Sequence, residues 1–246
     1  MADVIWANAL DKIKPYIFQI YTPRGYGSGF QIYCSDTLCG VATASHVAEH
    51  AMEWDEPIRI RHYTSKESII LKHVDRYYYT NNKRDLMVIL FRKDKLNVRD
   101  DALELIAMGR TLKQGIEVGW CGFPAVAPND LCFFEGHISS YLKEQQSYLV
   151  DGVVINGVSG GPAFYPKTAQ DMPLVYGIVS AYIPSRAAGE ALPGVCLIRS
   201  VQAFQSLLKE LKSIDVKEKK TKKAAIKKKK TAKKKKAKKK KKTSKD

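Results

Sequence analysis

Gly157-Val158-Ser159-Gly160-Gly161-Pro162 is the stretch of the chain that most narrows its fold and its chemistry. Glycine reaches positive φ angles at little steric cost, so a chain of this composition can turn sharply. A turn of this kind pushes one hydroxyl outward and aims nearby backbone N–H groups at a single point, which is the geometry that acyl transfer needs. The simpler interpretation is a Gly-rich turn between two strands. Other residues of the chain that could act with Ser159 decide between the acyl-transfer site and the simple turn.

A histidine and an aspartate precede Ser159, each where a short apolar run meets a turn. His46 lies in Thr43-Ala44-Ser45-His46-Val47, just after a short apolar strand, and Asp85 opens the apolar run 86–90. Taken alone, a histidine after a strand is usually a surface or core residue, and an aspartate before a strand is commonly a turn acceptor. Together, the three residue types supply the nucleophile, the general base and the group that orients the imidazole.

The other histidines and the cysteines give weaker signals. His50 follows His46 by one helical turn, but the residues between them do not form the HExxH motif of zinc enzymes. His62 and His73 are expected in exposed strands, and His137 opens a strand. The five cysteines lack paired CxxC spacing, so we expect no metal site and reduced thiols, with a single disulfide as the alternative; they are Cys34, Cys39, Cys121, Cys132 and Cys196.

Short strand-like segments separated by turn residues dominate the chain and predict an all-β sandwich or barrel. They are residues 16–21, 29–33, 40–43, 58–61, 68–74, 86–91, 115–121, 133–141, 147–151, 163–164, 175–181 and 195–198. Only the two ends look helical. Residues 3–14 suit a short amphipathic helix ended by Pro15, and residues 201–214 repeat apolar side chains at helical spacing.

The positive charge is concentrated at the C-terminal end. The formal net charge is +16, yet residues 217–246 hold 19 lysines and two acids, which leaves 22 basic and 23 acidic residues in 1–216. With Ile226 as its only large aliphatic side chain, the Lys217–Asp246 tail is expected to be disordered. A solubilising tail, a nuclear-import signal, and contact with nucleic acid or another polyanion all share this pattern.

No 18-residue apolar run and no leader-like N-terminus are present, so we expect neither a transmembrane helix nor a secretory signal. Together with the cysteine usage, this predicts an intracellular protein, either cytoplasmic or associated with nucleic acid in the nucleus.

Several segments together resemble the trypsin-like (chymotrypsin-fold) serine proteases. They are Gly27-Ser28-Gly29-Phe30, Thr43-Ala44-Ser45-His46-Val47, Asp85-Leu86-Met87-Val88-Ile89-Leu90, Gly157-Val158-Ser159-Gly160-Gly161-Pro162 and Gly177-Ile178-Val179-Ser180. The first of these, the segment Gly119-Trp120-Cys121-Gly122-Phe123-Pro124 and the lack of cysteine pairs are most similar to the HtrA-like branch. The resemblance spans residues 16–200 and keeps the order His, Asp, Ser.

The resemblance implies an all-β protease domain of two packed six-stranded antiparallel barrels at 16–200. An N-terminal helical segment at 1–15, a C-terminal helix at 201–216 and the disordered tail at 217–246 would flank it. The resemblance further implies a serine endopeptidase without metal or organic cofactor. His46 would act as general base and then acid, Asp85 would orient it, and Ser159 would form the acyl-enzyme.

Other site residues also follow from the resemblance. The backbone N–H groups of Gly157 and Ser159 would form the oxyanion hole, and Ser180 would lie on the strand that pairs with the substrate backbone. Val153 would lie at the base of the specificity pocket, and with Val154 and Val179 it predicts a preference for apolar side chains.

The sequence departs from the family pattern at two places. Val158 replaces the Asp that pairs with a freed N-terminus in secreted relatives, so activation by such a cleavage is not expected. We expect no PDZ-like domain after residue 200.

Three functional hypotheses emerge from the sequence. The first is an intracellular serine endopeptidase acting on protein or peptide substrates. The second is a catalytically silent binding module of protease fold whose basic tail contacts nucleic acid. The third is a protease that residues 217–246 tether to nucleic acid or another polyanion.

Overall fold

The computed structural model describes residues 2–166, 168, 170–184 and 191–213. The predicted tail at 217–246 and the end of the predicted C-terminal helix lie outside the described residues. The chain divides into two compact units, Met1–Ala203 and Phe204–Asp246. In the second unit, residues 204–213 are α-helical, as the apolar spacing predicts, and the short 3₁₀ helix Val201–Ala203 ends the first.

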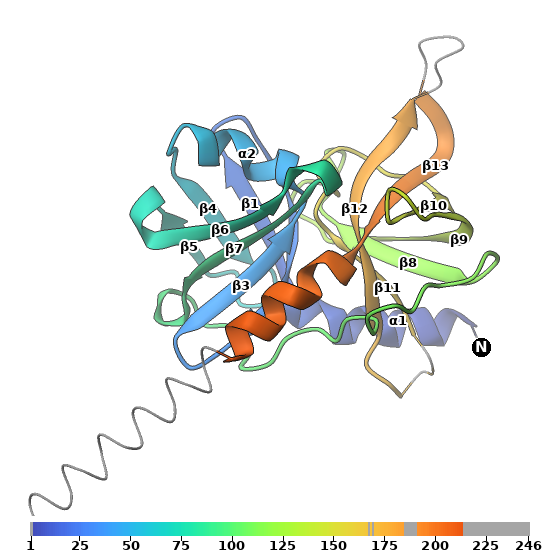
Figure 1. Cartoon of the computed structure of the whole chain (residues 1–246), viewed down its shortest axis with the longest axis horizontal. Coiled ribbons are helices and arrows are strands. Elements are labelled where there is room, and N and C mark those ends of the chain that lie inside the picture. Colours follow the sequence, from blue (N-terminus) through green and yellow to red (C-terminus); the bar gives the residue numbers. More distant parts are fainter. Residues whose placement is uncertain (1, 167, 169, 185–190, 214–246) are drawn as a thin grey trace, which may run out of the picture. The chain divides into compact units, whose positions relative to one another are not determined.

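The first unit holds two antiparallel sheets, coloured mainly blue to green and green to orange in Figure 1. The N-terminal sheet has seven strands in the order β5-β4-β1-β2-β3-β7-β6. Their bounds are β1 Ile17–Thr22, β2 Gly25–Cys34, β3 Leu38–Thr43, β4 Ile58–His62, β5 Ser68–Leu71, β6 Arg76–Asn81 and β7 Leu86–Arg92.

The second sheet is a closed barrel of six strands in the order β10-β13-β12-β11-β8-β9. Its strands carry large aromatic side chains that are fully buried, namely Trp120, Tyr148, Phe164 and Tyr176. The strand bounds are β8 Glu117–Gly122, β9 Cys132–Leu142, β10 Ser147–Asp151, β11 Pro162–Tyr165, β12 Leu174–Pro184 and β13 Ala191–Ser200. The all-β, two-barrel prediction is confirmed, except that the N-terminal sheet has seven strands instead of six and no ladder closes it among the described residues.

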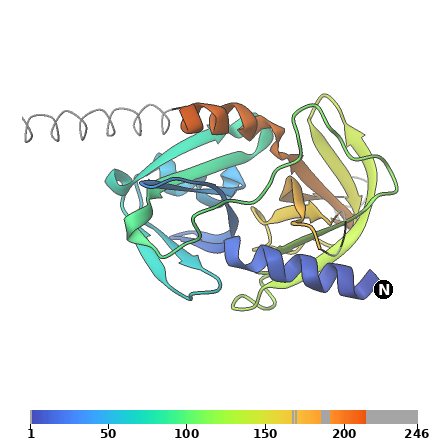
Figure 2. The ribbon, with the colours of Figure 1, turned by 90° about the horizontal axis from the view of Figure 1, so that it is seen from below.

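The N-terminal helix α1, Ala2–Ile13, runs along the closed barrel (Figure 2). Its Trp6 indole N–H donates to a Glu117 carboxylate oxygen at 3.0 Å, and its ring packs against Phe133 and Phe164. Pro15 follows within a short 3₁₀ helix, Lys14–Tyr16. The helix predicted for residues 3–14 is therefore present and covers apolar aromatic surface of the second barrel.

Strand alternation in the N-terminal sheet separates a core face from an outer face. Phe18 and Ile20 of β1 are fully buried in the core. The residues between and beside them, Gln19 and Tyr21, lie opposite Arg61 and Arg59 of β4. Because successive side chains in a strand point to opposite faces, these four polar and aromatic residues share the outer face.

Two elements were not expected from the sequence. Helix α2, Ser45–Glu53, follows β3 directly, so the expectation that only the two ends are helical is wrong. Strand β6 lies in a segment, Arg-Tyr-Tyr-Tyr-Thr-Asn, to which no strand was assigned. The strand expected at 68–74 ends at Leu71, and a 3₁₀ turn follows at His73–Asp75.

His62 was expected to be exposed but is only 4% exposed. Its ring nitrogens lie 2.9 Å from the Ser65 hydroxyl and 2.9 Å from the Pro15 carbonyl oxygen, and burial lowers its pKa. The imidazole thus links the end of β4 to the chain that enters β1.

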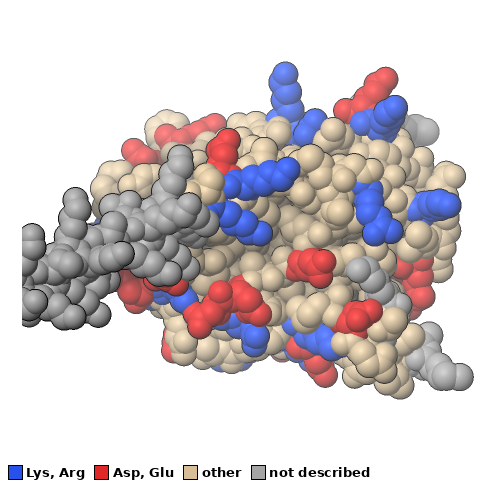
Figure 3. Space-filling view, turned by 60° about the horizontal axis from the view of Figure 1, so that its bottom comes forward, with Lys and Arg blue, Asp and Glu red and all other residues tan. Residues whose placement is uncertain are grey.

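Figure 3 shows acidic and basic side chains interspersed over one face of the molecule, in keeping with the near-neutral charge of residues 1–216. All five cysteines are free. Within the described ranges, no His, Cys, Asp and Glu cluster could hold a metal ion. No helix in that part of the chain is long and apolar enough to cross a membrane.

A buried guanidinium joins the two strands at the ends of the seven-stranded sheet. Arg76, the first residue of β6, donates to the carbonyl of Leu71, the last residue of β5, at 2.6 Å. It also donates to the carbonyls of Ala51 at 3.0 Å and Glu56 at 2.5 Å. The Arg76 side chain therefore joins β5 to β6, which no backbone ladder connects among the described residues. It also holds the end of α2 in place.

Replacement of Arg76 by Met should lower the free energy of unfolding by about 3 kcal/mol, because buried carbonyls lose charged donors and no water replaces them. Chemical denaturation of the full chain measures this loss. Arg92→Met is the matched control, since Arg92 is 71% exposed and should cost little. Equal stability of the two variants would contradict the role given to Arg76.

Candidate active site

The pairing of β3 with β7 brings His46 and Asp85 together. Thr43, at the end of β3, lies opposite Met87, near the start of β7. His46 is the second residue of the helix that follows β3, and Asp85 immediately precedes β7. Asp85 has a left-handed backbone with φ 52°, a conformation that aspartate tolerates better than most residues.

The carboxylate of Asp85 accepts hydrogen bonds from two different elements. His46 Nδ1 lies 2.9 Å from Oδ2 and 3.0 Å from Oδ1, and the His46 backbone N–H donates to Oδ1 at 3.0 Å. The Ser180 hydroxyl, on β12 of the second barrel, donates to Oδ2 at 2.6 Å. An ionised carboxylate only accepts, so Nδ1 carries the proton and Nε2 is left as the basic nitrogen.

These contacts shift the pKa values of both His46 and Asp85. The hydrogen bond to Asp85 raises the pKa of His46 above 6.5 against the opposing effect of burial, and the negative charges of Asp85 and Glu49 add to the rise. Burial alone would raise the pKa of Asp85, but the hydrogen bonds from His46 and Ser180 outweigh it and the pKa is lowered. The carboxylate is therefore ionised at neutral pH, and the imidazole is a stronger base than a free histidine.

Ser159 lies in the loop between β10 and β11. Its hydroxyl donates to the Ser180 carbonyl at 3.3 Å, and its own carbonyl accepts the Ser28 N–H at 2.8 Å. Among the described residues it makes no hydrogen bond to His46. Ser180 thus contacts both Asp85 and Ser159, and it joins these two side chains into one connected group.

The loop has the backbone geometry that the glycines predict. Gly157 and Gly160 have φ angles of 93° and 86°. A Cβ on Gly157 would lie 2.2 Å from the Phe123 carbonyl oxygen, and one on Gly160 would lie 2.1 Å from the Ser28 carbonyl oxygen. No side chain fits at either position, so only glycine allows this close approach of the loop to the rest of the protein.

Within Gly157–Gly161, two backbone N–H groups have no partner among the described residues. The amides of Val158, Gly160 and Gly161 donate to the carbonyls of Ile155, Val179 and Val158. The amides of Gly157 and Ser159 make no such bond in that part of the chain. These are the two groups expected to form the oxyanion hole.

Ser28 anchors the loop, a role that the sequence interpretation missed. Its hydroxyl donates to the Gly157 carbonyl at 2.8 Å and accepts the Phe123 N–H at 3.0 Å. Its carbonyl accepts the Thr43 hydroxyl at 2.8 Å. A serine flanked by glycines in a buried strand was the available signal, because such a hydroxyl needs partners.

The residues expected to line a specificity pocket differ in their exposure. Val153 is 53% exposed, and Val154 is half-buried. Val179 is fully buried, and its N–H and carbonyl bond to Gly161 and Gly160. That these three residues line a specificity pocket stays a prediction.

Two solved protease structures have a fold similar to that of this chain. A serine endoprotease from Yersinia pestis superposes with a TM-score of 0.61 at 18% identity, covering 84% of this chain and 66% of that one. The fold is that of the chymotrypsin-like serine proteases. The Rv3671c protease in its inactive form superposes with a TM-score of 0.54 at 16% identity, covering 78% of this chain and 87% of that one. No family model and no curated protein matches the chain.

This likeness confirms the predicted resemblance at the level of the fold. The chain spans just under two thirds of the Yersinia protein.

Asp85→Asn should lower the pKa of His46, because an amide removes the charge and weakens the hydrogen bond that raises it. The imidazole resonances followed by NMR through a pH titration measure the shift directly. With the wild-type pKa above 6.5, His46 becomes neutral at a higher pH than in the variant. Glu49→Gln is the control, since it removes a nearby charge but no hydrogen bond to His46, and its effect should be smaller. An unchanged midpoint in Asp85→Asn would contradict the assigned coupling.

Proposed function

We propose that the protein is a serine endopeptidase with His46, Asp85 and Ser159 as its catalytic residues. The observation that carries the proposal is the connected group of Asp85, His46, Ser180 and Ser159 beside two unbonded amides. A base oriented through Nδ1, a serine hydroxyl and free backbone donors are the parts that acyl transfer requires.

In the proposed reaction, the Ser159 hydroxyl leaves the Ser180 carbonyl and attacks the scissile carbonyl as His46 Nε2 takes its proton. The N–H groups of Gly157 and Ser159 stabilise the oxyanion. His46 then gives the proton to the leaving amine, and water releases the acyl group by the reverse sequence. Asp85 stays ionised and stabilises the imidazolium. Because Val153 is exposed, we base no side-chain preference on it.

Ser159→Ala should abolish labelling by a fluorophosphonate probe while leaving the denaturation curve unchanged, because the probe reacts with an activated serine hydroxyl. Ser139→Ala, at an exposed position of β9, is the matched control and should label like the wild type. Labelling is read by mass spectrometry of the intact protein. A folded wild-type chain that neither labels nor cleaves any peptide of a broad library would contradict the proposal.

A second candidate function is peptide binding without hydrolysis. The observation that favours it is the Ser159 hydroxyl bonded to the Ser180 carbonyl instead of His46. Hydrogen bonds of this kind often form only when substrate is bound, so the free geometry does not exclude catalysis. Tight peptide binding by a wild-type chain that stays unlabelled would support this second function.

We also propose that the lysine-rich end tethers the protein to nucleic acid or another polyanion. The charge supports it, since residues 1–216 are nearly neutral and residues 217–246 hold 19 lysines. Deletion of 217–246 should leave cleavage of a short peptide unchanged and remove salt-sensitive binding to duplex DNA or RNA. Fluorescence anisotropy at two salt concentrations measures this. Undiminished binding by the truncated chain would overturn the tether.

A further inference from the structure

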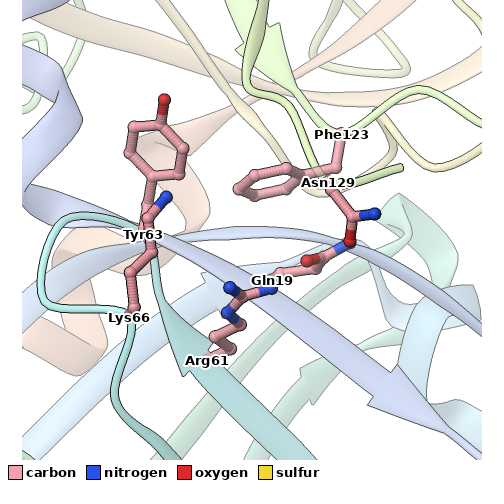
Figure 4. Close-up of a pocket in the computed structure, with 6 residues that line it drawn as sticks. All are labelled: Gln19, Arg61, Tyr63, Lys66, Phe123 and Asn129. Carbon is pink, nitrogen blue, oxygen red and sulfur yellow. The ribbon is translucent and has the colours of Figure 1, made fainter. Parts of the chain in front are cut away.

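A polar hollow lies on the outer face of the N-terminal sheet, beside the loop that carries Ser159. Its volume is about 180 Å³, part of it open to solvent, and its lining comprises Gln19, Arg61, Tyr63, Lys66, Phe123 and Asn129. Figure 4 shows the Arg61 guanidinium and the rings of Tyr63 and Phe123 around the space. Neither the proposed catalytic group nor the predicted specificity pocket uses any of these side chains.

The hollow has two cationic side chains and no acidic one in its lining. Among the described residues, neither Arg61 nor Lys66 forms an ion pair, and the Lys66 ammonium lies 4.1 Å from the centre of the Tyr63 ring. The acidic neighbours in sequence are Glu67, which accepts the Asn97 N–H, and Asp130, which does not line the hollow. The two cations therefore create a local positive potential suited to a carboxylate.

The floor and walls of the hollow are held in place by other contacts. Gln19 is 2% exposed, and its amide nitrogen donates to the Pro128 carbonyl at 2.7 Å while its oxygen accepts the Tyr21 hydroxyl at 2.5 Å. The rings of Tyr63 and Phe123 lie 5.8 Å apart. A rigid polar floor between aromatic walls reduces the entropy lost when a charged group binds.

Phe123 connects the hollow to the loop that carries the proposed oxyanion hole. Phe123, one of its walls, donates its N–H to the Ser28 hydroxyl that in turn donates to the Gly157 carbonyl. A Cβ on Gly157 would meet the Phe123 carbonyl oxygen and the Tyr26 ring, so the backbone of Phe123 packs directly against the loop.

The strands around Ser159 indicate which part of the substrate, before or after the scissile bond, lies near the hollow. The Ser159 hydroxyl bonds to Ser180 of β12, the strand expected to pair with the substrate backbone. The Ser159 carbonyl bonds instead to Ser28 of β2, and the hollow lies beyond β2 on β1 and β4. A leaving-group segment that follows β2 would extend towards Arg61 and Lys66.

We propose that this hollow is a binding subsite for an acidic side chain located C-terminal to the scissile bond. The inference rests on the proposed endopeptidase function and adds a substrate class to it. The Arg61 guanidinium and the Lys66 ammonium bind the carboxylate, and the rings of Tyr63 and Phe123 pack against its methylene groups.

Paired peptides that carry Glu or Gln at each of the first few positions after the scissile bond test the subsite. At one or two of these positions, the wild type should cleave the Glu peptide with a kcat/KM about fivefold higher than its Gln twin. The preference should shrink with added salt. Arg61→Gln combined with Lys66→Gln should remove this preference, so that the double variant cleaves the Glu and Gln peptides with equal kcat/KM.

A charge-matched double variant, Arg92→Gln with Lys143→Gln, is the control, because both residues are exposed and neither lines the hollow. It should keep the Glu preference, and denaturation curves should show both double variants folded. Equal cleavage of Glu and Gln peptides by the wild type overturns the subsite but leaves the endopeptidase function standing. If both double variants lose the preference for the Glu peptide equally, the subsite is also overturned, because the change in net charge would then explain the loss.

Binding of the same peptides to Ser159→Ala, measured by fluorescence anisotropy, separates the two proposals. A Glu preference in binding that requires Arg61 and Lys66 supports the hollow as the carboxylate site. If the wild type cleaves no peptide but this binding preference persists, the endopeptidase function fails and the hollow is a peptide-binding site instead of a leaving-group subsite. If neither cleavage nor binding distinguishes the peptides, the subsite is overturned.

Discussion

The carboxylate of Asp85 is the group on which the geometry of the site depends. It accepts the backbone and ring N–H groups of His46 from one sheet and the Ser180 hydroxyl from the other barrel. A single anion therefore fixes the imidazole tautomer and joins the two sheets beside Ser159. Because it is largely buried, its charge requires these donors, and their loss would leave an uncompensated ion in the protein.

A second connection between the sheets runs through Ser28. Its backbone and hydroxyl bond to Ser159, Gly157 and Phe123, so strand β2 holds the loop of the second barrel against the first. The loop can approach this closely only because Gly157 and Gly160 carry no side chain. The same contacts place Phe123 between the loop and the polar hollow, which links the proposed chemistry to the proposed recognition of an acidic side chain.

Local patterns in the sequence predict much of the fold and of the candidate site. Short strand-like segments bounded by turn residues locate most strands, and the glycines around Ser159 predict a turn with positive φ angles. Helix α2 was missed although Val47, Ala48, Ala51 and Met52 have helical spacing. The sequence interpretation treated this segment only as the end of a strand followed by a histidine. Strand β6 was missed because three consecutive tyrosines show no alternation of polarity, and Arg76 at its start is buried only through contacts with β5 and α2.

The sequence by itself determined which chemical groups are present and the local backbone they favour: a serine among glycines, a histidine after a strand, an aspartate before one and a near-neutral body with a basic end. Only the tertiary structure decided which groups meet. Ser180 bonds to Asp85 across 95 positions, Ser28 reaches Gly157 across 129, and Val153 lies exposed where a pocket was expected. Local pattern reflects short-range sterics and polarity, whereas these contacts arise from the packing of two sheets whose relative placement no short segment encodes.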